Sequence, residues 1–113
     1  MFKVKGKEYP CCMSVAMGLV GGKWKTVILY HLMENGTLRY NELYKKMGTI
    51  TERALSLQLK QLQEDAIIER KVYTTKPPLK VEYSLTKLGL TLVPALKVIE
   101  DWGNYMIEAH SDT

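Results

Sequence analysis

The chain has 113 residues, enough for one compact hydrophobic core and too few for two separate ones. Hydrophobic residues make up 46% and charged residues 25%, so the composition excludes an intrinsically disordered chain. The 16 Lys and Arg exceed the 12 Asp and Glu; positions 37–60 are basic, whereas positions 86–113 are acidic. A locally basic surface is typical of proteins that bind a polyanion, and a solvated charged face is the alternative.

The beginning of the chain superficially resembles a signal peptide, because basic residues 1–7 precede the apolar segment 11–20. Pro10 interrupts this pattern, and no stretch reaches the roughly 20 apolar residues that a membrane span requires. The two cysteines, Cys11 and Cys12, are adjacent and cannot form an ordinary disulfide framework. We therefore expect a cytoplasmic protein that does not associate with a membrane.

Helical spacing of apolar residues dominates the first half of the chain. Residues 13–32 are predicted to form two helices, separated by a break at Gly21-Gly22. Asn35-Gly36 is a turn, and the segment after it, with Tyr40, Leu43 and Met47 along one face, is predicted to form a third, short helix.

A fourth helix is predicted over about residues 51–65. Gly48 marks the turn before it, and Thr51 is a suitable N-cap because its hydroxyl can accept a backbone N–H. Leu55, Leu59 and Leu62 then recur at helical intervals. Two short helices joined by a tight turn that contains glycine form a helix-turn-helix unit, here about residues 40–65. The second helix of such a unit normally enters the major groove of DNA.

A β-hairpin is predicted to follow over residues 67–85. Residues 68–74 favour a strand, and the alternation of apolar and polar residues over 81–85 indicates a second strand with one buried face. The connector, residues 75–80, contains Pro77 and Pro78, which fix φ and cannot donate to a β-ladder, and carries a lysine near each end. We interpret this hairpin as a wing.

A final helix is predicted over residues 86–110, with Thr86 as its cap and Pro94 either kinking it or starting its second half. Its apolar stripe is too large to be covered easily by so small a core, so we expect a homodimer that buries it. Packing of the stripe on its own domain is the alternative. The predicted dimer-interface residues are Leu96, Ile99, Trp102 and Met106.

The predicted fold class is therefore α+β, mainly α: one winged helix-turn-helix domain over residues 1–113. Several motifs recur in a familiar order: a cysteine thirteen residues before the Trp of GGKWK at 21–25, LRYNEL at 38–43, LKQLQED at 59–65 running into IER at 68–70, PPLKVEYSLT at 77–86, and LG at 88–89. This ordered set resembles the HxlR-type family of transcriptional regulators over about residues 11–103.

The resemblance implies a regulator that dimerises through its terminal helices and represses or activates genes by binding double-stranded DNA at an inverted repeat. It places groove contacts on the exposed side of the fourth helix, at Thr51, Arg53, Ser56 and Lys60. Arg can bond a guanine edge with two hydrogen bonds, and a helix N-terminus favours a phosphate. Merely solvated side chains are the alternative. Leu57 departs from the family, in which a polar Gln is common at this position.

The wing lysines Lys76 and Lys80 are expected to reach phosphates or the minor groove; ordinary surface lysines are the alternative. Arg39 precedes the third helix, where it either contacts the DNA backbone or pairs with Glu42 at i+3.

Cys11 resembles a cysteine that some relatives use to sense electrophiles or oxidants through a reactive thiolate near a helix N-terminus. Cys12 departs from the family, which often has Pro there. A disulfide between subunits is geometrically easier than a vicinal one. Packing of two small buried thiols at the dimer interface is the alternative.

An enzyme is the competing class, but the sequence offers no nucleophile with a base, no metal-ligand spacing and no phosphate-binding glycine loop. We expect no catalytic activity, no metal site and no cofactor. A winged-helix module that binds protein instead of DNA is the remaining alternative, because the fold alone does not determine function.

Overall fold

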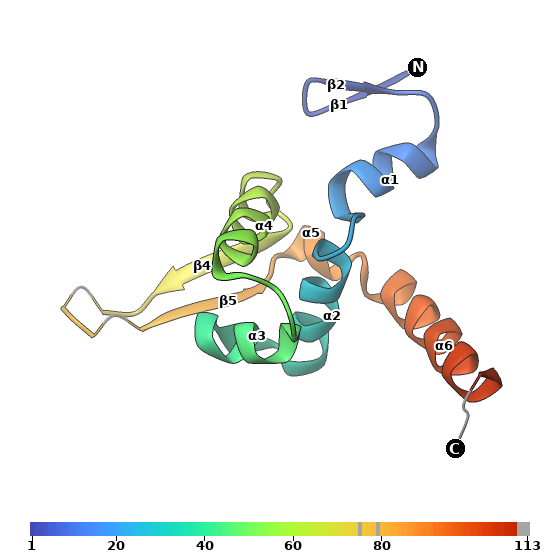
Figure 1. The fold of residues 1–113 in the computed structure, drawn as a ribbon. Coiled ribbons are helices and arrows are strands. Elements are labelled where there is room, and N and C mark those ends of the chain that lie inside the picture. Colours follow the sequence, from blue (N-terminus) through green and yellow to red (C-terminus); the bar gives the residue numbers. More distant parts are fainter. Residues whose placement is uncertain (75, 79, 111–113) are drawn as a thin grey trace.

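The computed structural model describes residues 1–74, 76–78 and 80–110 (Figure 1). Thr75 and Leu79 of the predicted connector, and the polar end at residues 111–113, lie outside the described residues. The elements in chain order are β1 (Phe2–Val4), β2 (Lys7–Tyr9), α1 (Cys12–Val20), α2 (Lys25–Asn35), β3 (Thr37–Arg39), α3 (Tyr40–Met47), α4 (Glu52–Glu64), β4 (Ile68–Val72), β5 (Val81–Leu85), α5 (Lys87–Leu90) and α6 (Val93–Ala109).

The hydrophobic core lies where α2, α3 and α4 meet the small sheet. α2 has an apolar sequence and buries one side, whereas α3 and α4 are amphipathic and bury only the face that carries their leucines. The largest fully buried side chains come from these helices and from the start of β4; they are Ile28, Leu29, Leu32, Leu43, Leu55, Leu59, Leu62 and Ile68. α4 is therefore fixed along its inner face, and its outer face remains free.

An antiparallel sheet of order β3-β5-β4 forms the wing and its base. Leu38 in β3 and Arg70 in β4 both lie opposite Tyr83 of β5, and the side chains of Leu38 and Tyr83 are buried. The third helix begins at Tyr40, with Arg39 before it as expected, and residues 37–39 form a strand that the sequence pattern did not predict. Pairing with β5 carries the side chain of Leu38 into the core, so the helix begins only at Tyr40.

The other predicted helices agree closely with the structure. α4 occupies Glu52–Glu64 with Thr51 and Asp65 as its caps, against the expected 51–65. The final helix is divided: Thr86 caps the short α5, and Pro94 lies in the first turn of α6. Pro94 therefore starts the second half, one of its two predicted roles. In Figure 1, α6 extends from the body on the side away from the wing.

An N-terminal hairpin, which the sequence analysis did not predict, precedes α1. β1 pairs with β2 through a turn at Lys5 and Gly6, whose φ values are 49° and 81°. The ring of Tyr9 lies against the face of α1 at Gly18, where an added Cβ would come within 2.7 Å of Tyr9 Cε1. Gly18 thus allows the hairpin to approach the helix closely.

The arrangement confirms the predicted class, an α+β fold that is mainly helical with a β-hairpin after the fourth helix. No helix among the described residues is long and apolar enough to cross a membrane.

Candidate nucleic-acid interface

The central unit of the site is the pair α3 and α4. Gly48 ends α3 with a φ of 82°, and the side chain of Ile50 is buried within the connection. Thr51 then caps α4, its hydroxyl accepting a 3.1 Å hydrogen bond from the amide of Ala54. The predicted N-cap is confirmed. Because the cap uses only one of the unpaired amides of the first turn, the N-terminus of α4 keeps donors that can meet a phosphate.

The outer face of α4 carries the predicted contact residues. Arg53, Ser56 and Lys60 are exposed, opposite the buried leucines of the same helix. Leu57 is also exposed, at 50%, so the apolar departure from the family lies on this face and is available to contact a thymine methyl group.

Tyr40 braces the start of α4 from the neighbouring helix. Its hydroxyl donates to the carbonyl oxygen of Glu52 at 3.2 Å and lies 3.4 Å from Ser56 Oγ. The Tyr40 and Tyr44 rings are stacked at 6.4 Å. The sequence pattern predicts for Tyr40 only a place on one helical face. Its position as a support for the candidate recognition helix depends on the tertiary packing of α3 on α4.

Arg39 lies at the end of β3, directly before α3. Its backbone N–H donates to Glu42 Oε1 at 2.9 Å, which closes the N-terminus of α3. Within the described residues, the only ion pair within 4.0 Å joins Lys80 and Glu82, so the guanidinium of Arg39 does not pair with Glu42. The expected ion pair between Arg39 and Glu42 is therefore replaced by a hydrogen bond from the backbone of Arg39. The side chain of Arg39 is exposed and remains free for its other expected role, a contact with a DNA backbone.

The wing brings two basic side chains close to one aromatic ring. Lys71 Nζ and Lys80 Nζ lie 5.3 Å and 5.2 Å from the ring centre of Tyr73, whose side chain is half-exposed. Lys80 also pairs with Glu82 at 3.6 Å, and Lys76 is exposed. Lys76 and Lys80 were expected here from the sequence, whereas Lys71 and Tyr73 were not. The signal that could have identified them is a Lys two residues before a Tyr in a strand, because such residues lie on the same face.

Figure 1 shows the β4–β5 hairpin projecting from the body beside α4. α4 and the wing therefore lie on one side of the molecule, and α6 lies on the other.

The apolar stripe of α6 divides into buried and exposed members. Leu96 is 5% exposed and belongs to the core of its own chain, so its expected place in an unburied stripe is wrong. Trp102 is 64% exposed and Ile99 is half-exposed, whereas Met106 is partly buried. Other exposed apolar residues on α6 are Val98, Tyr105 and Ile107, and Met13 and Met17 are exposed on α1.

Both cysteines are exposed at the start of α1. Exposure in a single chain is compatible both with a reactive thiol and with the alternative in which the two thiols are buried only at a dimer interface. The Ser14 hydroxyl lies 3.5 Å from Cys11 Sγ, and hydrogen bonding to the side chain and backbone of Ser14 lowers the pKa of the Cys11 thiol. Within the described residues, no group of three or more His, Cys, Asp or Glu side chains is placed so that it could hold a metal ion.

A helix-turn-helix pair followed by a β-hairpin with basic side chains defines the class of winged helix-turn-helix proteins. Residues 19–111 match the model of the family described as HxlR-like helix-turn-helix. The chain belongs to this family, as its motifs suggested.

Its relatives include HTH-type transcriptional regulators. The regulator YdeP of Bacillus subtilis (strain 168) is 47% identical over 93 residues, which cover 82% of this chain and 71% of YdeP. The regulator BH0655 of Halalkalibacterium halodurans is 49% identical over 87 residues, 77% of this chain and 76% of BH0655. Among solved structures, the redox regulator HypR in its oxidized form is similar to this chain, with a TM-score of 0.78 and 40% sequence identity. The match covers 91% of this chain and 100% of the HypR chain.

Proposed function

We propose that this protein is a transcriptional regulator that binds double-stranded DNA as a homodimer, with α4 in the major groove. The observation that carries the proposal is the division of α4 into two faces. Leu55, Leu59 and Leu62 fix the inner face in the core, and the outer face presents Arg53 and Lys60 to solvent. A rigid helix with exposed cationic and hydrogen-bonding groups suits base-edge recognition.

The wing supplies contacts of a different kind. Lys71, Lys76 and Lys80 are exposed cations on a hairpin beside α4, which suits the neutralisation of phosphates next to the groove that α4 reads. Arg39 and the N-terminus of α4 add further donors to a DNA backbone. Phosphate contacts position the protein, and Arg53 and Ser56 specify the sequence.

The exposed residues of α6 support a homodimer. Trp102, Ile99 and Ile107 are all more than half-exposed, and an apolar groove of about 270 Å³ between α2 and α6 includes Ile99 and Ile107 in its lining. A second copy covers this surface and places two recognition helices on a two-fold axis. Such a dimer binds an inverted repeat whose half-sites lie about one helical turn, ~34–36 Å, apart.

Thiol sensing is proposed as the regulation of this dimer. Cys11 is exposed and has a lowered pKa, and the similar structure HypR is described as a redox regulator. An oxidant such as diamide takes two electrons and two protons from two Cys11 thiols, one in each subunit, and an intersubunit disulfide forms. DNA affinity in diamide is expected to change in the wild type and not in Cys11→Ser; Cys12→Ser should respond as the wild type does.

Selection of bound fragments from a random DNA pool tests the DNA proposal. We expect enrichment of an inverted repeat, and binding of one dimer per repeat. A pool that remains random after repeated rounds, with folded protein, would instead favour the winged-helix module that binds another protein.

A further inference from the structure

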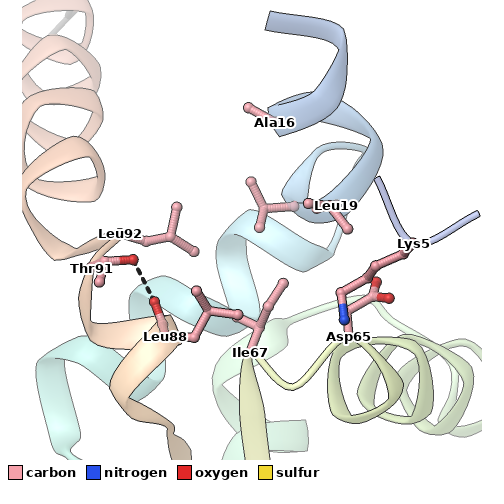
Figure 2. A pocket seen from close by; sticks show the side chains of 9 residues that line it. Lys5, Ala16, Leu19, Asp65, Ile67, Leu88, Thr91 and Leu92 are labelled. Atoms are coloured by element: carbon pink, nitrogen blue, oxygen red, sulfur yellow. Dashed lines mark hydrogen bonds between the residues drawn. The ribbon is translucent and has the colours of Figure 1, made fainter. Parts of the chain in front are cut away.

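A small apolar cavity of about 130 Å³ lies between α1, the end of α4 and the start of α6 (Figure 2). Its walls are formed by the aliphatic side chains of Ala16, Leu19, Val20, Ile67, Leu88 and Leu92. Polar groups are contributed by Lys5, Asp65 and Thr91. The proposed DNA-binding and dimer surfaces use none of these residues.

The size of the cavity suits a single ring. An enclosed apolar cavity of about 150 Å³ binds benzene, and this hollow, which is partly open to solvent, has nearly that volume, so it accommodates one ring with part of the ring facing solvent. The aliphatic lining reinforces this match, because burial of apolar ligand surface is its main attraction.

The polar groups indicate what such a ring should carry. Lys5 lies in the turn of the N-terminal hairpin and Asp65 ends α4, and Figure 2 shows both side chains on the same side of the cavity. Their opposite charges cancel, which disfavours a charged ligand. A hydroxyl group can donate to a carboxylate and accept from an ammonium group at the same time. The hydroxyl of Thr91 is already engaged as a donor to the carbonyl oxygen of Leu88.

The cavity also connects the two functional ends of the molecule. Asp65 is the C-cap of α4, and the carbonyl oxygen of Ile67 accepts a 3.1 Å hydrogen bond from the amide of Thr86, which caps α5. Ala16 lies on α1, and Leu92 is the N-cap of α6, so both terminal helices also line the cavity. A ligand in the cavity therefore touches the end of the recognition helix together with both terminal helices.

We propose that this cavity is a binding site for a small neutral molecule with one ring and one hydroxyl group, of the size of phenol, and that its occupation changes the affinity for DNA. Only the effect on DNA rests on the proposed function; binding of the ligand does not. The effect arises if the ligand binds more tightly to one arrangement of α4 and the terminal helices than to another.

Titration of the full, isotopically labelled chain with phenol, followed by two-dimensional NMR, tests binding. We expect saturable shifts centred on the amides of Ile67, Leu88 and Leu92. Ala16→Leu fills the cavity and should abolish these shifts, whereas Ala109→Leu, which adds the same volume at the exposed end of α6, should not. Absence of saturable shifts in the wild type, or shifts centred elsewhere, would overturn the proposal even if a variant failed to fold.

Toluene and benzoate test the ligand class. Phenol should bind more tightly than either compound. Asp65→Asn should lower the affinity for phenol by about tenfold, the equivalent of one hydrogen bond to a charged group, and should leave the affinity for toluene unchanged. Equal binding of toluene, or tighter binding of benzoate, would contradict the assigned class.

DNA affinity with and without phenol separates this inference from the proposed function. We expect a change in the wild type and in Ala109→Leu, and none in Ala16→Leu. Phenol binding without any effect on measurable DNA affinity would overturn the effector role, whereas a protein that binds phenol but no DNA would contradict the proposed function and leave the ligand site standing.

Discussion

The hydroxyl of Thr86 donates a 2.6 Å hydrogen bond to the carbonyl oxygen of Ala66. Thr86 also accepts from the amide of Gly89 at 3.0 Å, which caps α5, and its own amide donates to the carbonyl oxygen of Ile67. The end of the candidate recognition helix and the start of the terminal helices are therefore joined at one point. The orientation of α4 relative to α6 depends on this junction.

Replacement of Ala66 by Gly should stabilise the protein. Ala66 has a φ of 60°, and α4 ends around it through hydrogen bonds from the amide of Ala66 to Gln63 and from that of Ile67 to Leu62. The left-handed conformation costs a residue with a Cβ about 1–2 kcal/mol, partly offset by the greater backbone entropy that Gly loses. We expect a gain of about 0.5–1 kcal/mol in the free energy of unfolding, measured with urea.

The matched control is Ala95→Gly on the exposed side of α6. It should lower the free energy of unfolding by about 1 kcal/mol, because Gly is unfavourable within a helix. Destabilisation by Ala66→Gly of the same size would contradict the strain at the end of α4.

Gly89→Ala should destabilise the same junction. Gly89 is buried, and an added Cβ would collide with the carbonyl oxygen of Ile67 and lie 3.2 Å from Leu85 Cδ2. Overpacking against backbone that cannot move costs about 1–3 kcal/mol. Thermal or urea unfolding measures the loss. Gly103→Ala, where an added Cβ meets nothing within 4 Å, should be neutral or slightly stabilising, and equal effects of the two variants would be inconsistent with this packing.

Local signals were sufficient to predict most of the helix-turn-helix unit and the wing. Thr51 and Thr86 act as caps through their hydroxyl groups, and Pro94 starts a helix, because these roles depend on residues only a few positions apart. The outward position of Arg53 and Lys60 followed from the helical repeat of the leucines.

Tertiary packing decided the features that the sequence did not reveal. Leu38 lies directly before the helical pattern of Tyr40, Leu43 and Met47, and it forms a strand because it pairs with β5 and fills the core. Leu96 and Trp102 share one apolar stripe, and only the direction in which α6 leaves the body determines which of them is buried. The cluster of Lys71 and Lys80 around Tyr73 depends likewise on the pairing of β4 with β5.

Trp102→Lys should weaken the dimer. Trp102 is exposed in the single chain, and each subunit of a dimer buries one copy, so losing both should raise the dissociation constant about a hundredfold or more. Sedimentation measures the effect. Leu90→Lys, an exposed apolar position on α5, is the control and should leave the dimer intact. A folded Trp102→Lys variant that dimerises as the wild type does would contradict this interface, as would a wild type that stays monomeric with DNA present.

Alkylation of Cys11 as a function of pH, measured in a Cys12→Ser background, tests the environment of the thiol. Hydrogen bonding to Ser14 lowers the pKa of Cys11, so the thiolate and its reaction should appear at lower pH than for an ordinary cysteine. Ser14→Ala removes the side-chain contribution and should move the profile to higher pH. Identical profiles for the two proteins would show that Ser14 does not activate Cys11.

The DNA affinity of Arg53→Ala, measured in parallel on the selected inverted repeat and on random DNA, tests most directly whether α4 reads sequence. We expect a loss of about 1–3 kcal/mol on the repeat and far less on random DNA. Lys80→Ala should instead weaken both equally and reduce the slope of log K against log salt by roughly 0.9, whereas Lys97→Ala on α6 should change neither. If folded Arg53→Ala and Lys60→Ala variants keep both affinities unchanged, α4 is not the recognition helix.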